Sequence, residues 1–230
     1  MTTTLKIKNR RQSLFIGKKQ FLIILISLLG FSCLAAADFE KGMQKGKEIF
    51  NDAKTFQEIV DVTNYYERIA EANKSEWLPL YYAAYASLSA GFQQEKPDSK
   101  DEWFQKGLGF IERAKEIKKD ESEIFALEGY LKLMYISNKP MLRAPTQTGK
   151  AIELLETAKK LNPSNPRPWL IHGQNTLYTP EFFGGGSDNA KPLLEKASAL
   201  YTTYEPQGSL LPSWGKERCE MLLEKCAEKK

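Results

Sequence analysis

Residue types that usually carry out catalysis are sparse in this chain of 230 residues. His172 is its only histidine, and no nucleophile motif accompanies it. Acid–base and covalent catalysis need such groups in matched pairs. The carboxylates Glu153 and Glu156 have the spacing of a solvated helix face. We therefore predict that the chain is not an enzyme and that it needs no cofactor.

The cysteine spacing argues against a metal site and against an internal disulfide. Cys219 and Cys226 are seven residues apart in an expected helix, which separates them by about 10 Å along its axis. A disulfide needs Cα atoms within roughly 7 Å, so these two cannot bridge each other there. No CxxC motif and no metal-type spacing are present. Two partly buried thiols are favoured, and an intermolecular disulfide in an oxidising compartment is the alternative.

Residues 182–186 (FFGGG) join two aromatic residues to three glycines. A phosphate-binding loop is disfavoured, because no Lys-Ser/Thr pair follows and no strand is expected before it. Glycines let the chain turn where other residues cannot, and adjacent rings on such a turn suggest a contact point. We predict that Phe182 and Phe183 are binding residues on a loop.

Residues 1–37 have the layout of a bacterial secretory signal peptide. A basic region without acidic residues is followed by a short apolar run and by Ala35-Ala36-Ala37, an A-x-A cleavage site before Asp38. The run is shorter than the roughly 20 residues that a membrane-spanning helix needs. We predict cleavage and a periplasmic or secreted protein. An uncleaved anchor and a lipoprotein acylated at Cys33 are less favoured alternatives.

The charge of the chain changes when this segment is removed. It contains six of the 33 Lys and Arg residues and none of the 29 Asp and Glu residues, so residues 38–230 have a net charge of −2. No long basic tract remains, and no nucleic-acid partner is predicted. We expect one domain over residues 38–230, with no stable membrane insertion after cleavage.

A spacing of four, three and five residues recurs along this domain. The recurrences are Val62/Tyr66/Ile69/Lys74, Gly107/Ile111/Ala114/Lys119 and Ala151/Leu155/Ala158/Pro163, with Ala190/Leu194/Ala197 keeping the first two intervals. Apolar residues at helical spacing surround each of them. We expect four helical hairpins, beginning near Phe39, Trp77, Ser122 and Asn165, and a last helix over residues 213–228.

On this spacing, residues 39–201 resemble the tetratricopeptide repeat (TPR) family, whose period is about 34 residues. The segments YYERIAEANKSEW and LNPSNPRPWLIHGQNTLYTPEFFGGG are also similar to a group of secreted repeat proteins from Bacteroidetes-type bacteria. The resemblance implies an all-α, TPR-like α-solenoid, a right-handed superhelix of about four hairpins with a C-terminal capping helix. It also implies that Gly129 and Gly173 are small so that a paired helix can approach.

In this family the concave groove is lined by fixed positions of each first helix. Carried over by register, these positions give the predicted binding residues Tyr81, Tyr85, Tyr130, Gln174 and Tyr178. Tyrosine suits such a surface, because it combines apolar area with a hydroxyl at low entropy cost. Packing between repeats is the alternative role for half of these rings. Arg167 is the only cation at these positions, so no clamp for a peptide carboxylate is predicted.

The connections inside the last three hairpins are longer than the repeat requires. In a repeat of this period the small residue of the first helix and the start of the second helix are about 12 residues apart. Here the interval is 23 residues from Ala84 to Gly107, 22 from Gly129 to Ala151 and 17 from Gly173 to Ala190. We expect loops over residues 93–99, 137–148 and 179–189, all on one edge of the solenoid. Functional loops fit this pattern, and so do extended helices with plain surface loops.

These observations favour a scaffold that binds a protein or peptide of unknown identity on its concave face. The alternative is a component of a transporter system that binds a small ligand or a solute-binding partner. An open groove would favour the first function, and a closed pocket of ligand size would favour the second.

The exported protein is expected to begin at Asp38, or within two residues of it, because the A-x-A site ends there. N-terminal sequencing of the periplasmic fraction checks this expectation. An intact Met1, or a lipid attached to Cys33, would contradict it.

Overall fold

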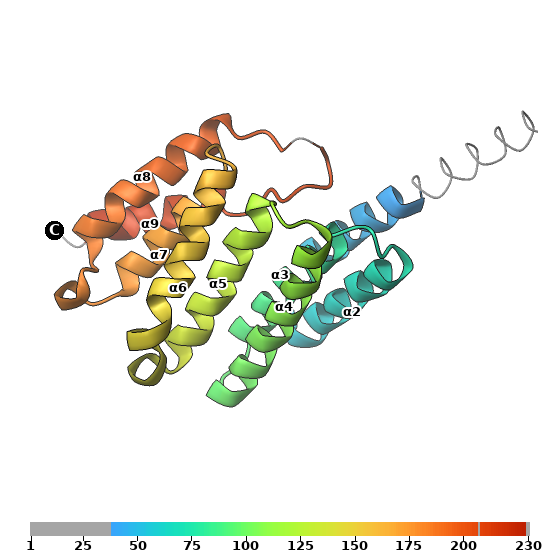
Figure 1. Ribbon diagram of the computed structural model, residues 1–230, viewed down its shortest axis with the longest axis horizontal. Helices are drawn as coiled ribbons and strands as arrows, with labels where there is room; N and C mark the ends of the chain where they lie inside the picture. Colours follow the sequence, from blue (N-terminus) through green and yellow to red (C-terminus); the bar gives the residue numbers. More distant parts are fainter. Residues whose placement is uncertain (1–37, 207, 229–230) are drawn as a thin grey trace, which may run out of the picture. The chain divides into compact units, whose positions relative to one another are not determined.

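Figure 1 shows the protein as a computed structural model that describes residues 38–206 and 208–228. The expected signal peptide, with Cys33, lies outside the described residues. The chain falls into two compact units, residues 1–42 and 43–230. In the first unit only residues 38–42 are described, and they are helical; everything below concerns the second. In the described part of the chain, no helix is both long and apolar enough to cross a bilayer.

The described part of the second unit is built from helices and contains no strand, so an all-α fold is confirmed. Its first helical stretch covers residues 43–52. The later elements are α2 (Phe56–Ala72), α3 (Leu78–Phe92), α4 (Pro97–Ile117), α5 (Ser122–Asn138), α6 (Pro140–Leu161), α7 (Arg167–Tyr178), the 3-10 helix η1 (Glu181–Phe183), α8 (Ser187–Thr203) and α9 (Lys216–Glu228).

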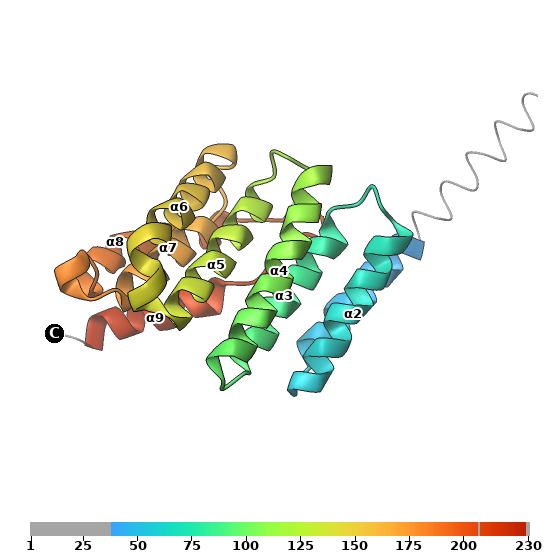
Figure 2. The same cartoon turned by 60° about the horizontal axis from the view of Figure 1, so that its bottom comes forward.

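Helices that are neighbours in the sequence are also neighbours in space. α3 packs against α4, α5 against α6 and α7 against α8, and α2 packs against α3. α5 also contacts α3 and α7, while α9 packs on α8 and touches α7. The two views of Figures 1 and 2 show these hairpins side by side. We call α3, α5 and α7 the inner layer, because they contact one another in turn.

Glycines allow the paired helices to approach closely. A Cβ on Gly173 would lie 2.8 Å from Leu194 Cδ2 of α8. A Cβ on Gly129 would lie 2.6 Å from Leu155 Cδ2 of α6. Both are positions that the repeat spacing predicts to be small. Gly46, which the sequence reading did not single out, plays this part in the first hairpin, where a Cβ would lie 2.7 Å from the Tyr66 ring.

Of the three expected loops, the one over residues 137–148 is wrong and the one over residues 93–99 is shorter than expected. α4 begins at Pro97 and α6 at Pro140, so most of residues 137–148 and the end of residues 93–99 are helical. Proline fits the first turn of a helix, where its missing N–H would have had no helical partner. α6 also contains Pro145 in its second turn. The long connections are thus mainly extended helices, the alternative that the sequence left open.

An ion pair holds the first turn of α6 in place. Arg143 is buried, and its Nη1 and Nη2 donate to the two carboxylate oxygens of Asp101 on α4 at 2.7 and 2.5 Å. This bidentate pair holds the pKa of Asp101 well below its usual range. The same turn leaves Met141 and Leu142 exposed to solvent.

The last helix, α9, begins at Lys216 rather than at residue 213. Gly215, with a φ of +112°, turns the chain into α9. A Cβ there would lie 2.0 Å from the hydroxyl of Tyr201, so glycine is required for both space and backbone conformation. The chain before this turn has no regular structure of its own.

Gly173 is expected to reject a large side chain. Gly173→Leu would drive the new side chain into Leu194 and destabilise the fold by roughly 1–3 kcal/mol, the usual cost of overpacking. Chemical denaturation measures this loss. Gly109→Leu is the matched control, because a Cβ on this α4 glycine meets nothing within 4 Å. Equal stability of the two variants would contradict the packing described here.

Candidate binding site

Residues 208–215, which we call the strap, lie against the inner layer and are held there through their backbone. Four of their carbonyl oxygens accept hydrogen bonds from side chains of the helices. The pairs are Lys47 Nζ to Ser209 O (2.7 Å), Tyr82 Oη to Leu210 O (2.8 Å), Arg167 Nη2 to Pro212 O (2.5 Å) and Tyr201 Oη to Trp214 O (3.2 Å). The centre of the inner layer is therefore covered by the chain's own extended segment.

Trp214 of the strap contacts three of the predicted groove tyrosines. Its ring stacks on Tyr85, with centroids 4.8 Å apart and an interplanar angle of 13°, and lies 6.2 Å from the Tyr130 ring. Its Nε1 donates to the hydroxyl of Tyr81 at 2.9 Å. These tyrosines share one face, as the register predicts, but in this structure they pack against the strap.

A buried ion pair lies beneath the strap. Arg167 and Glu123 are 0% and 5% exposed, and Arg167 Nη1 donates to Glu123 Oε1 at 2.8 Å. The hydroxyl of Tyr81 donates to the other carboxylate oxygen at 3.2 Å. Burial raises the pKa of Glu123, and the charge of Arg167 opposes that rise. Arg167 is therefore committed to the interior and is not available to a ligand.

The inner layer continues beyond the strap to a second contact, between α7 and α9. Gln174 Nε2 donates to the hydroxyl of Tyr130 at 3.2 Å, and Gln174 Oε1 accepts from Arg218 Nε at 2.9 Å. One turn further along α7, the hydroxyl of Tyr178 accepts from Lys225 Nζ at 3.2 Å. All five predicted groove residues thus belong to one connected set of contacts.

Of the five predicted groove residues, only Tyr178 is exposed, at 53%. On α9 it faces Arg218, Met221 and Lys225, whose spacing of three and four residues places them on one side of the helix. Met221 is 52% exposed, and Lys225 Nζ also lies 4.5 Å from the centroid of the Tyr178 ring. We call these four residues the open patch, since solvent reaches them.

The exposed ring pair Phe182 and Phe183 follows directly after α7. The two rings are 92% and 73% exposed and pack edge to face, with centroids 5.2 Å apart. The glycines behind them are fixed, because Gly186 N donates to Thr176 O at 3.0 Å and a Cβ on Gly185 would overlap the backbone of residue 179. The predicted contact loop is therefore a short turn that is fixed by backbone contacts and that exposes two aromatic rings to solvent.

Tyr178 also differs from the other groove tyrosines in acidity. Partial burial raises the pKa of its hydroxyl, but the hydrogen bond from Lys225 and the charge of Arg218 outweigh this effect, and the pKa lies below its ordinary value. Burial raises the pKa of Tyr81 and Tyr130. The open patch is therefore a place where a phenolate is stabilised.

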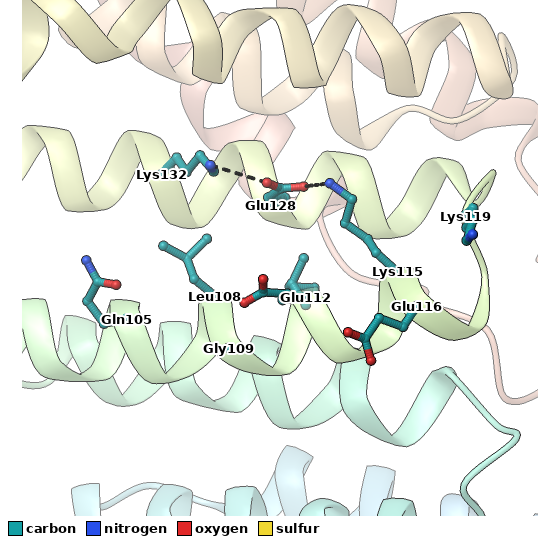
Figure 3. A pocket seen from close by; sticks show the side chains of 10 residues that line it. Gln105, Leu108, Gly109, Glu112, Lys115, Glu116, Lys119, Glu128 and Lys132 are labelled. Carbon is teal, nitrogen blue, oxygen red and sulfur yellow. Dashed lines mark hydrogen bonds and ion pairs between the residues drawn. The ribbon is translucent and has the colours of Figure 1, made fainter.

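A separate groove of about 610 Å³ lies between α4 and α5, as Figure 3 shows. Lys115 and Lys132 both pair with Glu128 there, at 2.6 and 3.3 Å. The other lining residues include Glu112, Glu116 and Lys119, and no aromatic ring is among them. Because Lys115 and Lys132 are already paired with Glu128 and no aromatic surface is present, this groove is a weaker candidate than the open patch.

The described residues contain no group of three His, Cys, Asp or Glu side chains that could hold a metal ion. His172 Nδ1 lies 3.0 Å from Lys159 Nζ and 3.4 Å from Glu156 Oε1, both on α6, and burial lowers its pKa. Cys219 is a buried thiol whose Sγ donates to Leu194 O at 3.3 Å. Burial raises its pKa to about 11, which makes it unreactive.

The sequence reading missed Trp214, Arg218 and Lys225. The last helix was predicted to be a cap with a polar outer face, and no function was predicted for the residues before it. The signal for α9 was present, because two cations recur seven residues apart on one face. The sequence pattern places Trp214 on the apolar face of the expected last helix, but in the structure Trp214 precedes α9 and contacts Tyr81 and Tyr85 of distant α3.

No protein-family model matches the chain, and no curated protein matches it. Membership of the TPR family is therefore not shown. Among solved structures, the chain is similar to an all-α protein from a member of the Bacteroidetes. This is the HusA haemophore from Porphyromonas gingivalis, with 29% sequence identity and a TM-score of 0.72 over 83% of this chain and 94% of that chain.

The buried ion pair beneath the strap is expected to be essential for stability. Glu123→Gln leaves the Arg167 guanidinium without its counter-charge, and breaking a buried pair in this way costs about 3–5 kcal/mol. Urea denaturation measures the loss. The control is Glu71→Gln, which removes the partner of Arg113 in an exposed pair and should cost about 0–1 kcal/mol. Similar losses for both would show that the Arg167 pair is not desolvated.

Proposed function

We propose that this protein is an exported carrier of a planar, amphiphilic ligand of the haem class. The observation that carries the proposal is the open patch, where exposed Tyr178 and Met221 lie beside the cations Arg218 and Lys225. The similarity to a haemophore supports this class of ligand.

The residues of the open patch fit such a ligand. Haem combines a flat apolar macrocycle with two carboxylates. Tyr178 and Met221 offer the aromatic and polarisable surfaces that pack well against a ring. Arg218 and Lys225 offer charge-assisted hydrogen bonds to carboxylates, and η1 adds two exposed rings at the same end of α7. Haem is cargo in this proposal, and no catalytic activity is part of it.

The finer description of the fold and location belongs to the same proposal. Successive hairpins, each with its two helices in close contact at a small residue, support a right-handed, TPR-like solenoid. α9 then caps the last hairpin and also supplies three of the four residues of the open patch. The layout of residues 1–37 supports export to the periplasm or beyond.

A protein or peptide ligand on the concave face is the second candidate, and the strap itself favours it. The inner layer already holds an extended segment through four backbone carbonyls, as a peptide groove would. A foreign peptide would have to displace the strap and uncover the Arg167 charge. We therefore prefer a small ligand at the end of the inner layer that the strap leaves open.

Binding of ferric haem to the protein from Asp38 on is expected to be saturable and to depend on α9. Arg218→Gln combined with Lys225→Gln removes both cations of the open patch. Because a hydrogen bond to a charged group contributes about 1.5–3 kcal/mol, the double variant should bind at least about tenfold more weakly. Titration followed by Soret absorbance measures the affinity, and circular dichroism checks the fold.

The control variant removes two cations from the groove in Figure 3. Lys115→Gln combined with Lys132→Gln is expected to leave haem affinity nearly unchanged. Loss of binding in this variant alone would move the site to the groove between α4 and α5. If the wild-type protein shows no saturable binding, the proposed function is wrong.

A further inference from the structure

The open patch contains one oxygen atom suited to bind a ferric iron, the hydroxyl oxygen of Tyr178. The side chain is 53% exposed at the C-terminal end of α7. Lys225 Nζ donates to this oxygen from 3.2 Å. A phenolic oxygen has acceptor capacity beyond one hydrogen bond, so Tyr178 can accept from Lys225 and still donate electrons to a metal.

Other side chains that could serve as haem ligands are less suitable. His172 is directed to α6, where Lys159 and Glu156 contact its Nδ1. Cys219 is buried against α8. Met221 is exposed, but a thioether is a soft ligand, and ferric iron prefers a hard, anionic oxygen.

The surroundings of Tyr178 favour its anionic form. Lys225 lies at its hydroxyl, and Arg218 is two turns earlier on the same face of α9. Two cations beside one phenol stabilise a phenolate, and the lowered pKa of Tyr178 agrees with this geometry. Tyrosinate is an established axial ligand of haem iron in other proteins.

We infer that Tyr178 binds the ferric iron of the haem-class ligand through its oxygen, while Lys225 holds the same oxygen by a hydrogen bond. This inference rests on the proposed function and assigns it an iron-binding residue. On binding, Tyr178 releases its hydroxyl proton to solvent and donates an oxygen lone pair to the iron. The iron stays ferric and loses a bound water, so no oxidant or reductant is needed. The site accordingly prefers ferric over ferrous haem.

The test compares ferric haem with metal-free protoporphyrin IX, which has the same ring and carboxylates but no iron. Tyr178→Phe keeps the ring and removes the oxygen. We expect it to bind ferric haem at least about tenfold more weakly, to bind the metal-free porphyrin as the wild type does, and to lack the tyrosinate-to-iron charge-transfer band. Tyr65→Phe on α2 is the matched control and should keep that band.

A second variant tests direct contact with the iron. Tyr178→His replaces the oxygen with a nitrogen donor at the same residue, on a shorter side chain that the ligand can approach at the exposed end of α7. It is expected to bind ferric haem and to give the absorption and resonance Raman spectra of a nitrogen-ligated haem. Spectra identical to those of Tyr178→Phe would place residue 178 away from the iron and would overturn the inference.

The remaining outcomes separate this inference from the proposed function. If Tyr178→Phe binds both ligands as tightly as the wild type, the inference is wrong and the proposed function stands. If the variant loses affinity for both ligands equally, the hydroxyl acts on the whole ring system and is not the iron ligand. If the wild type binds neither ligand, the proposed function fails as well.

Discussion

The buried guanidinium of Arg167 fixes the strap over the inner layer. It is fully buried, and a buried cation needs a counter-charge and filled hydrogen bonds. Glu123 supplies the first, and the carbonyl oxygen of Pro212 supplies part of the second. Displacement of the strap would expose an unpaired side of this charge, so the ion pair fixes the strap on the inner layer. With the strap fixed, Trp214 stays stacked on Tyr85 and Gly215 sets the start of α9.

The closed centre decides where a ligand can bind. A groove of free tyrosines would accept an extended partner along its whole length, but here the strap already occupies that position. The strap is followed at once by α9, so the same segment that closes the centre also places Arg218 and Lys225 opposite Gln174 and Tyr178. The chain segment that covers the inner layer is therefore also the one that positions the α9 residues of the open patch.

Local rules predicted much of this structure from the sequence. Helical spacing placed Gly173 at a close helix contact and brought Tyr81, Tyr85 and Tyr130 to one face, because register within a helix depends on nearby residues. The loop expected over residues 137–148 failed for a local reason too, because Pro140 is favoured in the first turn of a helix and α6 begins there. The strap lay beyond such rules, since Trp214 and Tyr81 are 133 residues apart and no periodicity marks their contact. Only Tyr178 of the open patch was predicted as a binding residue, and the other three residues come from α9.

The charges of α9 give the open patch a selective role. Residues 38–230 carry a net charge of −2, so an anionic ligand is weakly repelled by the protein as a whole. On α9 the acidic residues Glu217, Glu220 and Glu224 alternate with the cations along the chain, and the helical spacing leaves Arg218 and Lys225 together on the side turned to α7. The face turned to α7 is therefore locally basic within an acidic surrounding. An anion is favoured there, and exposed apolar contacts from Tyr178 and Met221 are available to a ligand that is also flat and apolar. The two requirements together select amphiphilic anions over simple carboxylates, which would meet the cations but leave the apolar surface in water.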